Sequence, residues 1–221
     1  MQLILLAAGR GTRLQKKYRN KPKCLAKVNN KAIINYNLDF FDLFKTKYIV
    51  TGYKSYHLKN FAKKNNFKII HNSRYRSTNM TYSLFLAKKY VKDDIVVCYG
   101  DIIFNKNIYS LLKNKKNLVP LNINWLNLWK KRMLKQKIKE DAEDVVVRNN
   151  IVKSIGNKIT QKLPRYQYMG ILKLKKKTFF KMEKFFRTIN NEKIDMTNFL
   201  NKTIQSNKIK FWSKIYKSFW F

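Results

Sequence analysis

Short apolar runs alternate with amphipathic segments through the first half of the chain. Apolar runs that end at small or polar residues predict buried strands, the first beginning at Leu3 and the others covering 48–53, 67–71 and 95–101. Between them, apolar side chains recur at roughly helical spacing and predict helices over 32–44, 57–65 and 80–90. This β–α–β–α order predicts an α/β fold with a mostly parallel, doubly wound sheet.

The second half of the chain is richer in predicted strands. They cover 117–124, 144–147, 151–155, 168–174 and part of 209–221, and either extend the sheet or form a small β-rich subdomain. Helices are expected over 176–187 and 196–204, and a helix or an aromatic, basic arm over 125–138. Because no repeat, linker or change in composition divides the chain, we expect one domain over residues 1–221.

The charge balance is strongly basic, with a net charge of +37. Such a charge raises the possibility of nucleic acid or an anionic membrane as partner. The basic residues are 40 Lys and only 9 Arg, whereas a dedicated nucleic-acid binder more often uses Arg for bidentate contacts. We therefore expect no nucleic acid as the main partner.

The cysteines and the first apolar run bear on the compartment. Cys24 and Cys98 have no metal-binding or redox spacing, which is typical of reduced thiols. The apolar run at the start is too short for a signal peptide or a membrane span. We expect a cytoplasmic location and no membrane insertion.

A loop of small residues follows the first predicted strand. Ala7, Ala8, Gly9 and Gly11 leave room for consecutive main-chain N–H groups to face a ligand and form a concave anion site, and nearby arginines add positive charge. The loop lacks the Gly-Lys-Ser/Thr ending of a Walker loop and the Gly-x-Gly-x-x-Gly of dinucleotide folds. The pattern predicts a triphosphate site of another class.

Lys23 and Asp101 are the best candidates for charged partners of that triphosphate. The ring of Pro22 fixes the local backbone, so Lys23 can be held over the phosphates. Asp101 ends the strand over 95–101, and ligands of such sheets bind beyond the carboxyl ends of strands, where Gly9 also falls. A lone carboxylate there either binds Mg²⁺ together with substrate phosphates or caps a helix.

Other polar and aromatic residues each have two interpretations. The cluster Thr78–Leu84 either reads a base or ribose or caps a helix through Asn79. Four aromatic residues either form a wall for an ammonium group or belong to the core: Trp125, Trp129, Tyr166 and Tyr168. His57 and His71 are isolated, which favours surface imidazoles over a catalytic role.

Taken together, these segments resemble the sugar-1-phosphate type of nucleotidyltransferase, and most closely its phosphocholine and phosphonate cytidylyltransferase branch. The residues that carry the resemblance are Leu6–Arg13, Pro22-Lys23, Thr78–Leu84, Tyr99–Phe104, Trp125–Trp129, Arg132, Ala142-Glu143, Ile155-Gly156, Tyr168–Gly170 and Met196-Thr197. The likeness therefore extends over nearly the whole chain. It implies a Rossmann-like, GT-A-like sheet with a small β-rich extension on the acceptor side.

The resemblance also implies roles for individual residues. Arg13 and Lys23 would neutralise the phosphates, and Asp101 would bind Mg²⁺, these three being the catalytic candidates. The nucleotide would be lined by Leu6, Ala7, Ala8, Gly9, Gly11, Thr12, Arg13, Lys23, Thr78, Asn79, Ser83 and Gly100. The acceptor side would be lined by Glu143, Lys158, Tyr168 and Gly170.

The implied reaction transfers CMP from CTP to a 2-aminoethylphosphonate-like acceptor or phosphocholine, releases pyrophosphate, and serves surface glycan or lipid decoration. A sugar-1-phosphate nucleotidyltransferase using UTP or another nucleotide is the alternative within enzymes. A basic nucleic-acid-binding or noncatalytic nucleotide-sensing module is the alternative of another class.

Two departures from the resemblance stand out. Related chains continue after an aromatic such as Trp220 into a Glu-x-Asp segment whose acid completes the metal site, whereas this sequence stops at Phe221. We expect either that the sequence is truncated or that metal binding is weakened. Asn198 also stands where related chains often carry an acid.

Overall fold

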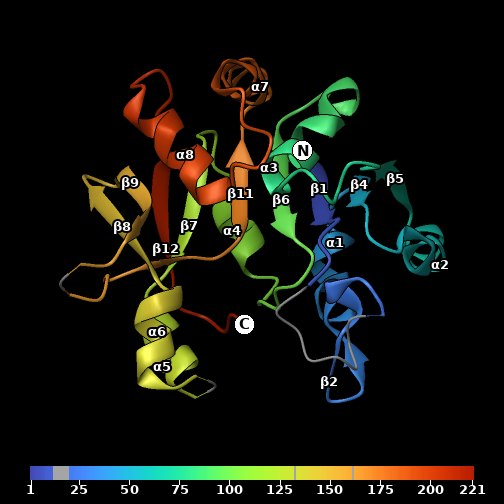
Figure 1. The fold of residues 1–221 in the computed structure, drawn as a ribbon, viewed down its shortest axis with the longest axis horizontal. Coiled ribbons are helices and arrows are strands. Elements are labelled where there is room, and N and C mark those ends of the chain that lie inside the picture. The colour runs from blue at the N-terminus through green and yellow to red at the C-terminus, as the bar shows by residue number, and fades with distance from the viewer. Residues whose placement is uncertain (12–19, 132, 161) are drawn as a thin grey trace.

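A mixed β-sheet runs through the centre of the computed structural model (Figure 1), which describes residues 1–11, 20–131, 133–160 and 162–221. Its strands in the described part of the chain, in chain order, are β1 (Gln2–Ala7), β4 (Thr46–Thr51), β5 (Phe67–His71), β6 (Ile95–Tyr99), β7 (Leu118–Asn122), β8 (Glu143–Arg148), β9 (Ile151–Lys158), β10 (Gln167–Tyr168), β11 (Ile171–Leu174) and β12 (Trp212–Tyr216). A separate two-stranded sheet pairs β2 (Lys27–Val28) with β3 (Lys31–Ala32).

The strands follow the spatial order β5-β4-β1-β6-β11-β7-β12-β9-β8, and β10 pairs with β7. From β5 to β6 all neighbours are parallel, as expected for strands joined by helical crossovers. β11 is antiparallel to both β6 and β7, β12 is parallel to β7, and β9 is antiparallel to β12 and β8. The predicted mostly parallel sheet is confirmed, and its mixed part lies in the second half of the chain.

The β8–β9 hairpin extends the main sheet, so the first of the two options for these strands is correct. The structure divides the segment over 125–138 into α5 (Trp125–Lys130) and α6 (Lys135–Asp141). The helix expected over 32–44 is shorter, consisting of the 3-10 helix η3 (Ile33–Asn37) and α1 (Leu38–Phe41).

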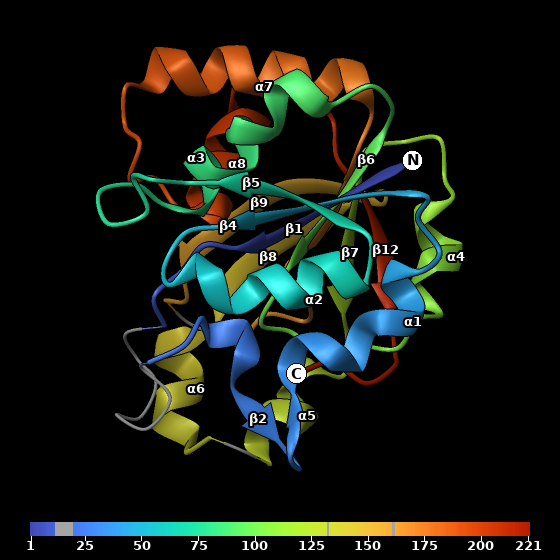
Figure 2. The ribbon, with the colours of Figure 1, turned by 90° about the vertical axis from the view of Figure 1, so that its right-hand side faces the viewer.

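Helices cover both faces of the sheet (Figure 2). On one face lie α3 (Met80–Phe85), α7 (Lys176–Ile189) and α8 (Met196–Gln205), whose apolar side chains pack with β1, β6 and β11. The other face carries α1, α2 (Lys59–Lys64) and α4 (Ile108–Leu112). Within the described ranges, the remaining helical segments are the 3-10 helices η2 (Lys23–Leu25), η4 (Ser55–Leu58) and η5 (Leu86–Tyr90).

The aromatic residues of α5 belong to the core beneath the second face. Trp125 is 1% exposed, packs edge-on against Trp129, and donates its indole N–H to Pro164 O at 3.2 Å. Tyr168 is also buried. The core interpretation of these three residues is therefore confirmed. Among the described residues, we find no helix with the length and apolar character needed to traverse a bilayer.

Candidate active site

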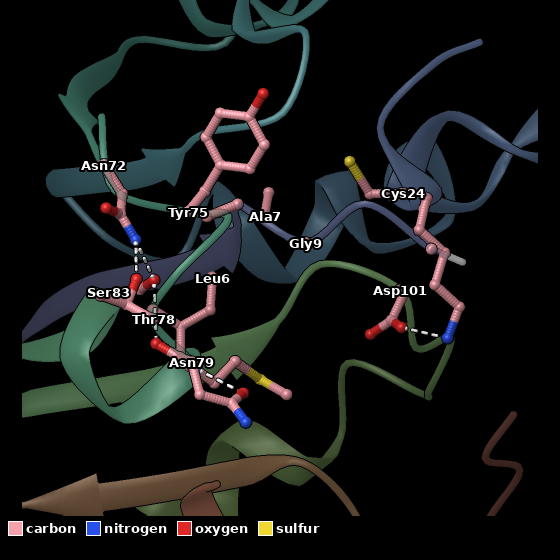
Figure 3. A pocket seen from close by; sticks show the side chains of 14 residues that line it. Leu6, Ala7, Gly9, Cys24, Asn72, Tyr75, Thr78, Asn79, Ser83 and Asp101 are labelled. Atoms are coloured by element: carbon pink, nitrogen blue, oxygen red, sulfur yellow. Dashed lines mark hydrogen bonds and ion pairs between the residues drawn. The ribbon is translucent and has the colours of Figure 1, made fainter. Parts of the chain in front are cut away.

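A pocket opens beyond the carboxyl ends of β1 and β6 (Figure 3). Four stretches of chain contribute to it: the end of β1 with the loop after it, the start of η2, the segment after β5 with the first residues of α3, and the residue after Gly100. Its lining in the described part of the chain comprises Leu6, Ala7, Ala8, Gly9, Gly11, Lys23, Cys24, Asn72, Tyr75, Thr78, Asn79, Met80, Ser83 and Asp101. Most residues expected to meet a nucleotide therefore lie around one cavity.

Close main-chain approach builds the floor of the pocket. Gly100 N donates to Leu6 O at 2.9 Å, which joins the ends of β1 and β6. A Cβ added at Gly100 would lie 3.1 Å from that same carbonyl oxygen. Gly100 does not itself line the cavity, but its lack of a side chain lets Asp101 follow directly into it.

The glycines of the β1 loop differ from each other. Gly11 has a φ of +63°, in the left-handed region that glycine adopts without steric cost. Gly9 lies outside that region, and a Cβ built on it would meet no atom within 4 Å. The space beside Gly9 is thus left free by the protein at the pocket wall.

Lys23 and Asp101 form an ion pair, with Lys23 Nζ 2.5 Å from Asp101 Oδ2. Both side chains are partly accessible, at 40% and 27% exposure, so a ligand can reach either group. Pro22, with a φ of −51°, precedes η2 and sets the direction in which Lys23 leaves the chain. Charges from two distant parts of the sequence therefore meet at the pocket, as the sequence predicts.

Cys24 follows Lys23 in the pocket lining and is 2% exposed. Burial, followed by the negative charge of Asp101, raises the pKa of the Cys24 thiol to about 12. The thiol therefore stays protonated at neutral pH and contributes an apolar wall rather than a nucleophile.

The polar cluster between β5 and α3 is held together by its own hydrogen bonds (Figure 3). Asn72 Nδ2 donates to Thr78 Oγ1 at 3.1 Å and to Ser83 Oγ at 3.0 Å, while Asn72 Oδ1 accepts from Arg74 N at 2.9 Å. Thr78 and Ser83 in turn donate to the main-chain oxygens of Arg74 and Asn79. These side chains shape the pocket as a fixed network.

Asn79 caps α3, because its Oδ1 accepts from Met80 N at 2.7 Å. The capping interpretation is thus confirmed for this residue, which also lines the pocket. Asn72 and Tyr75 were not predicted as pocket residues. Asn72 could have been found, since it directly follows the strand over 67–71 and so lies at the same sheet edge as Gly9 and Asp101.

A second cavity brings together two of the residues expected on the acceptor side, Glu143 and Lys158. It is lined by Gln136, Lys139, Glu140, Asp141, Ala142, Glu143, Gly156, Asn157, Lys158, Ile159, Leu163 and Asn198. Thr197 Oγ1 donates to Glu143 Oε1 at 2.8 Å. Burial raises the pKa of the Glu143 carboxyl above its ordinary value, with a further rise from Asp195, while the Thr197 hydrogen bond acts in the opposite direction.

Tyr168 and Gly170 line neither of these two cavities. Tyr168 packs edge-on against Tyr99, with ring centroids 6.0 Å apart. Gly170 has a φ of +77°, and a Cβ there would lie 2.7 Å from the Tyr99 ring. Both residues therefore pack against Tyr99, the last residue of β6. Thr12, Arg13 and Arg132 lie outside the described residues.

Comparisons with known proteins agree with this architecture. Residues 3–117 match the family of MobA-like NTP transferase domains. A CTP:phosphoglutamine cytidylyltransferase from Campylobacter jejuni is 30% identical over an alignment that covers 93% of this chain and 88% of that protein. A choline-phosphate cytidylyltransferase from Streptococcus pneumoniae is 33% identical, over 49% of this chain and 48% of its own length.

Two solved structures share the fold. The inositol-1-phosphate CTP transferase from T. maritima superposes with a TM-score of 0.79 at 19% identity, covering 99% of this chain and 87% of the other. The CTP:phosphocholine cytidylyltransferase from Streptococcus pneumoniae superposes with a TM-score of 0.76 at 21% identity, covering 98% and 90%. The fold thus occurs in these two enzymes. The family match and the Campylobacter relative show that the chain belongs to the MobA-like NTP transferase domain family and is a nucleotidyltransferase.

Proposed function

We propose that this nucleotidyltransferase is a Mg²⁺-dependent cytidylyltransferase that transfers CMP from CTP to a small acceptor bearing a phosphate or phosphonate group. The observation that carries the proposal is the meeting of the Gly9 loop, Lys23 and Asp101 around one pocket. CTP is the preferred nucleotide in the proposal because the two relatives described above are named as cytidylyltransferases.

The triphosphate would lie along the loop from Ala8 to Gly11, where the missing side chains leave space and main-chain N–H groups are available as donors. Lys23 would turn from Asp101 to the phosphates, since an ammonium group with 40% exposure at the pocket edge can reorient at little cost. The nucleoside would lie against the wall formed by Tyr75, Thr78 and Asn79.

The donor set of the pocket fits a magnesium ion held by one protein carboxylate. Asp101 is the acidic residue among the described pocket residues, and no group of three His, Cys, Asp or Glu residues in the described ranges could enclose a metal. Mg²⁺ commonly binds through one or two carboxylates together with substrate phosphate oxygens and water. When bound at Asp101, the ion would supply positive charge to the phosphates of the nucleotide.

The proposed reaction needs no nucleophile from the protein. An oxygen of the acceptor phosphate or phosphonate attacks the α-phosphorus of CTP and forms the new P–O bond. The bond from that phosphorus to the pyrophosphate oxygen breaks on the opposite side, and pyrophosphate leaves with the electron pair. Lys23 would stabilise the charge that develops on the leaving group, while the pocket aligns the two reactants.

For the acceptor, we propose a phosphonate or phosphate that carries an amine, such as 2-aminoethylphosphonate or phosphocholine. Lys158 would approach the anionic end, and the acids beside it, including Glu143, would face the ammonium end. This cavity is lined by both acids and lysines, so both ends of such an acceptor would find a group of opposite charge: Glu140, Asp141 and Glu143 for the ammonium, Lys139 and Lys158 for the anion.

The test is a matrix of reactions with Mg²⁺, each of the four nucleoside triphosphates, and the acceptors 2-aminoethylphosphonate, phosphocholine and glucose-1-phosphate, followed by release of pyrophosphate. We expect release with CTP and an amine-bearing acceptor. Release confined to UTP with the hexose phosphate would instead support a sugar-1-phosphate nucleotidyltransferase.

A further inference from the structure

The segment that forms the nucleoside side of the pocket, residues 72–79, is fastened to the loop between α7 and α8. Arg74 and Glu192 form a two-pronged ion pair, with one guanidinium nitrogen 2.9 Å from Glu192 Oε1 and the other in contact with Oε2. Asn79 is held by the same loop through its main chain, since Asn79 N donates to Glu192 O at 3.0 Å. Asn79 Nδ2 also donates to Lys193 O, at 3.1 Å.

The loop that receives these bonds is itself well anchored. Asn190 ends α7 with a φ of +51°, and Lys193 N donates to Asn191 Oδ1 at 3.0 Å. Ile194 is buried in the core at 6% exposure, and Asp195 caps α8 by accepting from Asn198 N at 2.8 Å. The main chain on both sides of Glu192 is therefore held by hydrogen bonds and by the burial of Ile194.

Arg74 completes the connection on the side of the pocket. Its guanidinium lies 5.3 Å from the ring centroid of Tyr82 on α3, and Arg74 N donates to Asn72 Oδ1. Hydrogen bonding to Glu192 raises the pKa of Arg74 above its ordinary value. A shift of Arg74 would consequently disturb the network of Asn72, which includes Thr78 and Ser83 in the pocket wall.

We propose that Glu192 is a positioning residue for the nucleotide pocket, acting through Arg74 and Asn79. Glu192 is not among the residues that line this pocket, so its effect would be indirect. The proposal rests on the proposed function, in that the pocket must bind CTP. A two-pronged Arg–carboxylate pair is more specific in geometry than a single-contact surface ion pair, which makes it suited to fixing a loop.

The experiment measures the CTP dissociation constant by isothermal titration with Mg²⁺ and no acceptor, together with kcat, KM and the melting temperature. Glu192→Gln should raise both the dissociation constant and the KM for CTP, by about threefold to fivefold, since the pair is exposed at 52% and 40%. We expect kcat to stay within about twofold of wild type and the melting temperature within about 2 °C. Exchanging the charges in an Arg74→Glu and Glu192→Arg double variant should recover most of the lost affinity.

Asp39→Asn is the matched control, because it removes an exposed partner of Lys106 away from both cavities. It should leave CTP affinity unchanged. If wild-type protein binds CTP but Glu192→Gln binds it equally well, the positioning role is wrong. A loss of affinity that follows a large fall in melting temperature, with no recovery in the charge-exchanged pair, would also overturn it. Failure of the wild-type protein itself to bind CTP would instead count against the proposed function.

Discussion

Lys23 Nζ and Asp101 Oδ2 lie 2.5 Å apart and join the segment after the β1 loop to the loop after β6. In this arrangement each group is occupied by the other. The Lys23 ammonium neutralises the carboxylate that would bind Mg²⁺, and the Asp101 carboxylate neutralises the ammonium that would bind phosphate. The pair must therefore open before either residue takes its proposed role.

Substitution of either partner should lower turnover strongly while leaving the fold nearly intact. We expect Lys23→Ala and Asp101→Asn each to lower kcat about 100-fold, because each removes charge stabilisation near the phosphates. Since both side chains are partly exposed, loss of the pair should cost no more than about 1 kcal/mol of unfolding free energy. Initial rates of pyrophosphate release and urea unfolding measure the two effects, with Lys106→Ala as a surface control. Near-normal turnover in both variants would contradict the proposed site.

A methyl group added at Gly9 should affect nucleotide binding, whereas one added at Gly52 should affect the stability of the fold. In Gly9→Ala the new Cβ enters open space at the pocket, so we expect weaker nucleotide binding with unchanged stability. In Gly52→Ala it would lie 2.7 Å from Tyr75 Cβ and 2.9 Å from Ala8 O, which should reduce the free energy of unfolding by about 1–3 kcal/mol. Neither position has the left-handed backbone that would add strain. Nucleotide titration and urea unfolding of the two variants make the comparison, and an unstable Gly9→Ala variant would show that the space is not free.

The cysteine thiols should resist modification in the folded protein. Burial raises the pKa of Cys24 to about 12 and raises the pKa of Cys98 well above its ordinary value, so neither is a thiolate at pH 8. We expect both thiols to react with Ellman's reagent only at the rate of unfolding, and rapidly in guanidinium chloride. Fast reaction of either thiol at pH 8 without denaturant would contradict the burial of that cysteine.

Glu143 should make stability depend on pH in a definite direction. Because its pKa is raised in the folded state, the folded protein binds the proton more tightly than the unfolded chain does. The contribution of Glu143 to the free energy of unfolding therefore falls as pH rises from the ordinary pKa of 4.5 through the raised pKa. Glu143→Gln removes this contribution, so the free energy of unfolding of the variant should rise relative to that of wild type as pH increases above the ordinary value of 4.5. Urea unfolding across that range measures the difference, and a gap that stays constant with pH would contradict the assignment.

The first half of the fold follows closely from local pattern. Strand ends in a parallel sheet meet at one edge, and for that reason Gly9 and Asp101 could be placed together from sequence alone. The roles of Gly170 and Glu192 could not be predicted. Gly170 is required because of the ring of Tyr99, and Glu192 matters because a loop 118 residues away carries Arg74. Both relationships depend on tertiary packing that no spacing along the chain records.

The position of the antiparallel strand β11 bears on which strands unfold locally while the rest of the sheet stays folded. It is hydrogen-bonded to β6 and β7 at the centre of the sheet, whereas the β8–β9 hairpin is an edge that meets β12 at one register pair. Amide hydrogen exchange should accordingly be slowest in β1, β6 and β11 and fastest in the hairpin. Sub-global opening would then loosen the surroundings of Glu143 and Lys158 while Asp101 stays in place, so the proposed acceptor cavity could change shape without moving the proposed nucleotide pocket.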